Sequence, residues 1–110
     1  MKLPEEGILL RIFIGETDRI HGKSLYEQIV LKARELGLAG ATVVRGIMGF
    51  GADSRMHSAK ILRLSEDLPI IIELVDTEEN LNKLIPFIDE NVVEGLVTME
   101  KVRIIKYRHK

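Results

Sequence analysis

The sequence predicts an α+β domain in which a single antiparallel sheet carries two helices on one face. Two segments with helical periodicity each lie between segments rich in β-branched residues, so the expected order is β-α-β followed by β-α-β. A glycine-rich stretch, with no third helix, joins the two middle strands and favours a hairpin there. Two right-handed split βαβ units of this kind give a ferredoxin-like βαββαβ sandwich. A doubly wound parallel sheet is the alternative, and the small number of helices disfavours it.

The first strand is expected over Gly7 to Ile14, where the chain is almost continuously apolar. Successive side chains of a strand point to opposite faces of the sheet, so two sets can be separated. The face expected under the helices carries Ile8, Leu10, Ile12 and Ile14, and the opposite face, called the open face below, carries Leu9, Arg11 and Phe13.

The first helix is expected over residues 24–37. Ser24 can cap its first turn with Glu27 as the reciprocal partner, and Gly37 is typical of a helix end. The apolar stripe at helical spacing consists of Leu25, Ile29, Ala33 and Leu36.

The second half repeats the pattern with different residues. Strands are expected over residues 40–48, 59–64 and 69–75, with a polar turn between the last two. A second helix begins at Asp76 or Thr77 and has a stripe of apolar residues at helical spacing. That stripe consists of Leu81, Leu84, Ile85 and Ile88.

The ends of the second helix carry their own signals. Asp76 and Glu79 form a second capping-box pattern. Pro86 lies inside the helical pattern and should kink or shorten the helix. The final apolar segment, residues 95–107, supplies one long strand or two short ones.

The open face of the sheet bears on assembly. Alternation in the third strand adds Ile71, Glu73 and Val75 to this face, and in the second strand Val43 and Ile47 share a face with Arg45. A surface of this kind is too apolar to lie in water comfortably. We therefore expect subunits to cover it for one another. Glu73 is the one carboxylate expected to be partly buried, and a salt bridge to an arginine of this face explains it.

Length and composition indicate one soluble domain spanning 1–110. The chain has no cysteine, which excludes disulfides and thiolate metal sites. A net charge of −1 argues against a general nucleic-acid binder, which usually carries a basic excess. The longest apolar runs fall far short of the roughly 20 residues that a membrane span needs, so no direct membrane insertion is expected. The N-terminus lacks the apolar core of a signal peptide, and a cytoplasmic location is expected.

The stretch "RGIMGFGADSRMHSAK" between the middle strands is the strongest candidate for a binding site. Gly46, Gly49 and Gly51 permit positive φ and a close approach of ligand to the main chain, where free N–H groups can form an anion-binding nest. Cations outnumber acids here, and Phe50 can stack on a base or plug the base of the loop. The basic candidates are Arg45, Arg55, His57, Lys60 and Arg63, against the single acid Asp53. An ordinary glycine-rich turn is the alternative, since no phosphate-binding signature of known spacing is present.

Two segments resemble the PII signal-transduction proteins. In "GLAGATVVRGIMGFG" a glycine turn ends a helix, an "xGxTV" strand follows, and "GFG" opens the long T-loop. "EKVRIIKY" resembles the PII C-terminal segment, whose "VRI" triplet carries an arginine for nucleotide phosphates. Nearly the whole chain, including "HSAKILRLSEDLPIIIELVDTEENL", is similar to an uncharacterised PII-like bacterial and archaeal family, the domain of unknown function called one-ninety.

The resemblance implies a PII-like protomer that assembles as a homotrimer closed by its sheets. It also implies a regulatory protein, not an enzyme, that binds an ADP-, ATP- or AMP-type nucleotide or another anionic small molecule in the clefts between subunits. Its loop would then signal to a target protein, by analogy a membrane transporter or channel. Gly49, Phe50 and Gly51 match the PII triplet at the loop base, and Arg103 matches the "VRI" arginine.

Other positions depart from the PII pattern. Ile105 stands where PII proteins have a second arginine, and the turn before the last strand is shorter and offers Leu96 in place of a phosphate-binding lysine. No tyrosine lies between Ala52 and Lys60, so uridylylation of the classical type is not expected. Arg55, His57 and Lys60 are candidates to replace the missing phosphate contacts.

Two further interpretations remain open. A small cleft enzyme would use His57 as its acid–base group with help from Asp53, and a purely structural oligomer would need neither. The three histidines lack the spacing of metal ligands, so no metal site is expected. The basic end "KYRHK" is either a solvated tail or folds over a neighbouring cleft.

Overall fold

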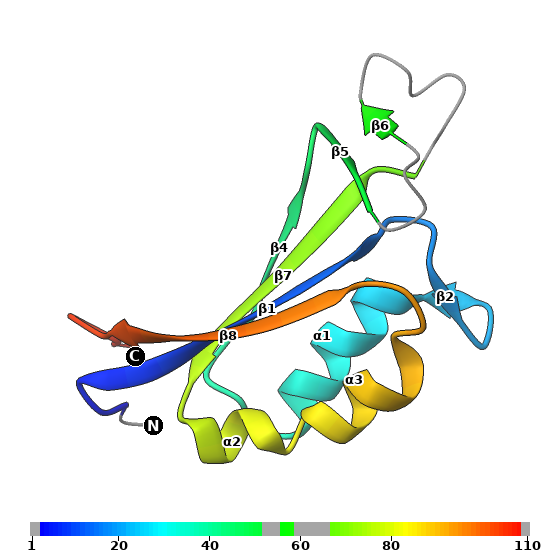
Figure 1. The fold of residues 1–110 in the computed structure, drawn as a ribbon. Coiled ribbons are helices and arrows are strands. Elements are labelled where there is room, and N and C mark those ends of the chain that lie inside the picture. Colours follow the sequence, from blue (N-terminus) through cyan, green and yellow to red (C-terminus); the bar gives the residue numbers. More distant parts are fainter. Residues whose placement is uncertain (1–2, 52–55, 59–66, 109–110) are drawn as a thin grey trace.

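The computed structural model of the chain describes residues 3–51, 56–58 and 67–108. Its main element is a four-stranded antiparallel sheet with the strand order β4-β7-β1-β8. The helices lie together under one face of this sheet, and both termini lie at the same end of it (Figure 1). The strands of the sheet are β1 (Glu6–Gly15), β4 (Thr42–Arg45), β7 (Pro69–Asp76) and β8 (Leu96–Arg103), and the helices are α1 (Leu25–Glu35), α2 (Glu78–Asn82) and α3 (Ile85–Asn91). This arrangement confirms the ferredoxin-like α+β sandwich and the antiparallel pairing of the two middle strands.

The core lies between the helices and the two central strands. On β1 and β7 buried and partly exposed residues alternate, as expected from the apolar pattern. The register between β1 and β7 places buried residues of the two strands opposite each other, for example Ile12 opposite Ile72. The core cluster consists of Leu10, Ile12, Ile14, Leu25, Ile29, Ala33, Ile70, Ile72, Leu74, Leu81, Leu84 and Ile88. Burial of this apolar set is the main stabilising contribution to the protomer.

Helix α1 begins and ends where the sequence predicts, but the predicted side-chain cap at its start is absent. Gly37 takes φ 78°, its N–H donates to the Arg34 carbonyl, and the Leu38 N–H donates to the Ala33 carbonyl. These two bonds form the Schellman motif that a glycine after a helix favours. Ser24 stands at the N-cap position, yet its side chain makes no capping hydrogen bond, so the predicted capping box is wrong. A short hairpin, β2 (Arg19–Ile20) with β3 (Lys23–Ser24), leads into the helix instead.

The second helical segment is divided where proline predicts a break. Pro86 lies in the first turn of α3. The two residues between α2 and α3 keep αR backbone angles, but their N–H groups donate to carbonyls three residues back instead of four, which interrupts the α-helical bonding. Thr77 is the N-cap of α2, and its hydroxyl accepts from the Asn80 N–H at 3.1 Å. The predicted pairing of Asp76 with Glu79 is therefore wrong, because Asp76 is fully buried and serves a different purpose described below.

The glycine-rich stretch bends the chain between β4 and β5, where Gly46 lies close to Pro69 and its backbone angles are ordinary. The expected strand 40–48 is split into β4 and β5 (Met48–Phe50), and β5 pairs with β6 (Met56–Ser58). At the bend the Gly46 N–H donates to the Pro69 carbonyl, and a Cβ on Gly46 would lie 2.7 Å from Cγ of Pro69. Positive φ, expected for the three glycines of this stretch, occurs at none of them. The expected strand 59–64 lies outside the described residues.

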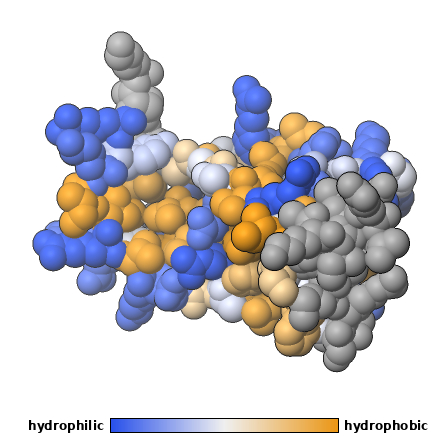
Figure 2. Space-filling view, turned by 90° about the horizontal axis from the view of Figure 1, so that it is seen from above, coloured by the Kyte–Doolittle hydropathy of each residue, from blue (hydrophilic) through white to orange (hydrophobic). Residues whose placement is uncertain are grey.

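The open face of the sheet is apolar with a charged cluster at its centre. Figure 2 looks down on this face and shows an apolar band bordered by hydrophilic side chains. Arg11 bonds to Glu73 at 2.8 Å and to Glu100 at 3.0 Å, which confirms the salt bridge expected for Glu73. The edge strands β4 and β8 are exposed along almost their whole length, since the helices cover only the central strands. Among the large apolar side chains that remain exposed on these two strands, Val44 and Leu96 lie on the open face, whereas Val43, Val97 and Met99 lie on the helix side of the sheet.

In the part of the chain that the structure describes, no helix combines the length and hydropathy required to cross a membrane. The same described residues contain no group of three or more side chains that could hold a metal ion.

Candidate functional site

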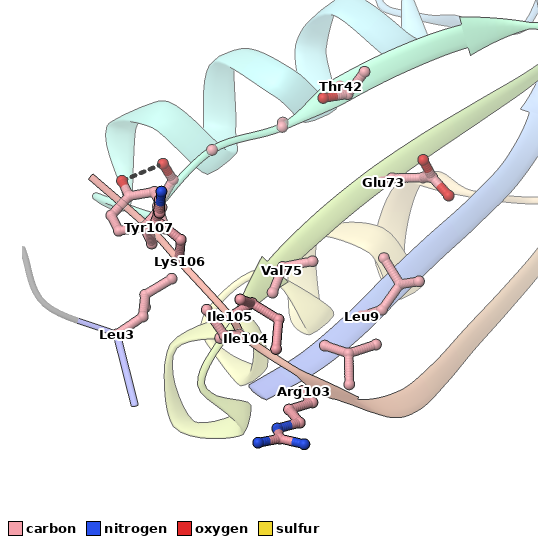
Figure 3. A pocket seen from close by; sticks show the side chains of 14 residues that line it. Leu3, Leu9, Thr42, Glu73, Val75, Arg103, Ile104, Ile105, Lys106 and Tyr107 are labelled. Carbon is pink, nitrogen blue, oxygen red and sulfur yellow. Dashed lines mark hydrogen bonds between the residues drawn. The ribbon is translucent and has the colours of Figure 1, made fainter. Parts of the chain in front are cut away.

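A pocket of about 680 Å³ lies at the end of the open face beside the start of β1 and the end of β8 (Figure 3). Its floor is apolar and comes from Leu9 of β1, Val75 of β7 and Val102 of β8. Thr42 and Glu73 stand on the same face of the sheet and supply polar groups at one side. The volume lies within the range of sites for small molecules and cofactors.

Two chain segments form the rim of the pocket. One is the turn 39–41 between α1 and β4, and the other is the C-terminal segment that follows β8. The C-terminal segment crosses the end of the sheet, because the Tyr107 hydroxyl donates to the Ala39 carbonyl at 2.9 Å (Figure 3). Its start is fixed by the Ile104 N–H, which donates to the Glu5 carbonyl at 2.6 Å. Gly7 permits this crossing, since a Cβ there would lie 2.6 Å from Cδ1 of Ile104.

The turn 39–41 is held from below by a buried carboxylate. Asp76 accepts from the Ala39 N–H at 2.8 Å through Oδ2, and through Oδ1 from the Thr77 N–H at 2.7 Å and the Asn80 side-chain amide at 2.9 Å. Asp76 is fully buried, and a buried carboxylate requires such donors to offset its lost hydration. The rim of the pocket therefore rests on a polar network inside the protomer.

The pocket carries charges of both signs. The cations Arg103 and Lys106 and the carboxylate Glu73 all belong to its lining, and Glu73 is paired with Arg11. The side chain of Arg103 is 74% exposed, and its guanidinium lies at the rim away from Thr42 and pairs with Glu5 at 3.3 Å (Figure 3). The hydrogen bond from Arg11 to Glu73 raises the pKa of the Arg11 guanidinium, and Glu100 adds to this effect. An apolar floor with a carboxylate, a hydroxyl and rim cations suits a flat, partly apolar ligand that carries an anionic group.

The residues predicted from the glycine-rich stretch lie at the other end of the sheet. Gly49, Phe50 and Gly51 follow β4 beside Pro69, which pairs with Gly15 at the far end of β1, whereas Arg103 pairs with Glu6 at the near end. At about 3.3 Å per residue the ends of β1 lie roughly 30 Å apart. Within one protomer, the loop base and Arg103 therefore cannot contact a single small ligand.

Three further predicted residues are described in whole or in part. Arg45 lies at the same distant end and forms an ion pair with Glu16 at 2.5 Å. Phe50 is 68% exposed, so it does not plug the base of the loop within the protomer. The backbone of His57 pairs with Gly49 across β5 and β6. Arg55 and Lys60 lie outside the described residues.

Several residues that line the pocket were not predicted as site residues from the sequence. Thr42 is an ordinary strand residue in the sequence, and Tyr107 was grouped with a basic tail. Glu73 carried a signal, as the single carboxylate within an apolar strand, but its position beside a pocket required the sheet register. For the basic end, the sequence allowed a solvated tail or a segment folded over a neighbouring cleft. The structure is closer to the second alternative, because the C-terminal segment folds over the pocket of its own protomer.

Comparison with known proteins identifies the family. The family model DUF190, whose description is Uncharacterized ACR, matches residues 7–104. The chain belongs to the DUF190 family. Among curated relatives, a UPF0166 protein of Aquifex aeolicus is 37% identical over 97 residues, which is 88% of this chain and 91% of that protein. The UPF0166 protein MJ1524 of Methanocaldococcus jannaschii is 36% identical over 99 residues, which is 89% of this chain and 91% of that protein.

Solved structures similar to this DUF190 chain have the PII-like fold. One is CPII, a nitrogen regulatory PII-like protein from Thiomonas intermedia K12 bound to ADP, AMP and bicarbonate. It matches with a TM-score of 0.64 and 18% identity over 92% of this chain and 90% of that chain. A second CPII structure, bound to ADP and bicarbonate, matches with a TM-score of 0.60 and 20% identity over 92% of this chain and 90% of that chain. These likenesses confirm the PII-like form of the ferredoxin-like fold.

Proposed function

We propose that this DUF190 protein is a PII-like regulatory protein that binds an adenine nucleotide in the pocket at the end of the open face. The observation that carries the proposal is the pocket itself, where an apolar floor meets Thr42, Glu73 and the rim cation Arg103. A base fits such a floor, and phosphate oxygens accept hydrogen bonds from arginine. The binding of ADP and AMP by CPII, which shares the fold, supports the choice of nucleotide.

A second copy completes the site in this proposal. The loop base with Gly49, Phe50 and Gly51 lies roughly 30 Å from Arg103 in one protomer, so the two halves meet only if copies associate head to tail. A head-to-tail contact that closes on itself gives a ring, and the proposed ring is a homotrimer. Its interface would also cover the apolar open face, including Phe13 and Ile71.

Signalling is the last part of the proposal. Phosphate contacts would hold the segment after Gly51 in one arrangement, and that arrangement would dock on a target protein, by family analogy a membrane transporter or channel. The role is regulatory and non-catalytic, and the proposed location is the cytoplasm. Nucleotide turnover that disappears in a His57→Ala variant would favour the small enzyme instead.

Isothermal titration calorimetry with ADP, AMP, ATP and cyclic nucleotides tests the proposal. We expect at least one of them to bind at millimolar concentration or below, and to stabilise the fold by about 2.7 kcal/mol at 100 times its dissociation constant. Arg103→Ala and Thr42→Val should weaken binding, whereas Lys101→Ala, on the same strand but outside the pocket lining, should not. Absence of binding by every nucleotide would overturn the nucleotide proposal.

Native mass spectrometry of the same samples tests the assembly. We expect three copies with nucleotide retained in proportion to the number of sites. A monomer at micromolar concentration would contradict a site shared between copies, even if a nucleotide binds.

A further inference from the structure

The C-terminal segment over the pocket, residues 104–107, is fixed chiefly at its two ends. At the start, the Ile104 N–H donates to the Glu5 carbonyl. At the far end, the Tyr107 hydroxyl donates to the Ala39 carbonyl across the sheet. Between these points Ile105 is 79% exposed, so the middle of the segment gains little from burial. The far end therefore depends strongly on the contact that Tyr107 makes.

The acceptor of that contact belongs to a rigid part of the protomer. The Ala39 N–H donates to the buried Asp76 carboxylate, while the Ala39 carbonyl accepts from Tyr107. One peptide segment at the pocket rim is thus held from the core side by Asp76 and from the surface side by the C-terminal segment. This arrangement gives the segment a fixed place to close against.

We propose that residues 104–107 are a lid over the pocket and that the Tyr107 hydroxyl is its latch on Ala39. The inference rests on the proposed function and adds a positioning residue and a means of regulation to it. Lid closure slows departure of a bound ligand, and a bound ligand in turn keeps the lid closed. Lys106 belongs to the same segment and to the pocket lining, so an anionic ligand favours the closed lid.

The strength of the latch suits a lid that opens. A hydrogen bond between neutral groups replaces bonds to water, and its net contribution is small. Tyr107 is 37% exposed, so water competes for both the hydroxyl and the carbonyl. Loss of the bond should therefore change the closed population by a factor of roughly three to ten, without unfolding the domain.

Hydrogen exchange of the free protein tests the latch without any ligand. Tyr107→Phe removes only the hydroxyl, and Tyr26→Phe on α1 is the matched control at the other tyrosine of the chain. We expect amides of residues 105–108 to exchange about three to ten times faster in Tyr107→Phe than in wild type, with no change in Tyr26→Phe. Equal exchange in Tyr107→Phe and wild type would overturn the latch.

Exchange and dissociation kinetics with ADP test the coupling. ADP should slow exchange of residues 105–108 in wild type, and a fluorescent ADP analogue should leave Tyr107→Phe about three to ten times faster with its association rate nearly unchanged. Loss of the same bond should lower the unfolding midpoint of the free variant by only about 3–6 °C, so the variant stays folded during the assay. A faster dissociation with an unchanged association rate is the result that a merely structural role would not predict. Bound ADP with unchanged exchange or unchanged dissociation would refute the lid. If ADP and the other nucleotides fail to bind wild type, the proposed function fails, and the exchange of the free protein alone decides the latch.

Discussion

Replacement of Asp76 by asparagine should destabilise the protein strongly, because this carboxylate joins β7, the start of α2 and the rim turn. Its two oxygens accept from three donors, one from Ala39, one from Thr77 and one from the side chain of Asn80. An asparagine side chain has only one acceptor oxygen. In either orientation its NH₂ group must therefore face a donor, and at least one buried N–H loses its partner.

The magnitude follows from the bonds lost. A hydrogen bond to a charged group contributes about 1.5–3 kcal/mol, and an unpaired buried donor costs about 1–3 kcal/mol, with overlap between the two. We expect Asp76→Asn to lower the free energy of unfolding by about 3 kcal/mol. With 110 residues and about 2.1 cal/mol/K of unfolding entropy per residue, the midpoint should fall by roughly 13 °C.

Urea and thermal unfolding at one fixed protein concentration provide the assay, since association would otherwise shift the midpoint. Asp89→Asn is the matched control, because Asp89 is an exposed residue of α3 and its replacement should change stability by less than about 0.5 kcal/mol. Equal midpoints for the two variants would show that the buried network does not support the rim, and the reasoning would be refuted.

Two further pairs of variants test local features. Gly46→Ala should destabilise by about 1–3 kcal/mol in chemical unfolding, because its Cβ would lie 2.7 Å from Cγ of Pro69, whereas Gly51→Ala has no atom within 4 Å and should be nearly neutral. Similar losses in both would contradict the packing explanation. Thr77→Ala should cost about 1 kcal/mol through loss of the α2 cap, while Ser24→Ala, which makes no capping bond, should cost much less. A larger loss for Ser24→Ala would show that the serine caps α1 in solution.

The regular elements follow from local pattern. Alternation of apolar residues along β1 and β7, the stripe of α1 and the glycine at its end each depend on neighbours within a few positions. Pro86 likewise divides the second helical segment through its own ring and its missing N–H. The resemblance of "GLAGATVVRGIMGFG" and "EKVRIIKY" to PII proteins added the family and the fold, which the DUF190 match and the CPII structures confirm.

The helix starts show where local pattern fails. Ser24 and Glu27 have the spacing of a capping box, but the β2–β3 hairpin delivers the chain to α1 in another way, and the Leu25 N–H donates to the Asp18 carbonyl. Asp76 has the spacing of a cap as well, yet burial turns it into an acceptor for a turn 37 positions earlier in the chain. Competing partners from distant segments decide such cases.

The sequence by itself determined the two central strands, the first helix and its end, the break in the second helical segment, which side of β1 is buried, and which family the chain resembles. Only the tertiary structure decided that the loop base and Arg103 lie at opposite ends of the sheet, and that Thr42, Glu73 and Tyr107 meet around one pocket. The physical reason is range. Strand and helix patterns arise from the covalent geometry of neighbouring residues, whereas a pocket depends on the register of strands and on a single hydrogen bond between positions 68 residues apart.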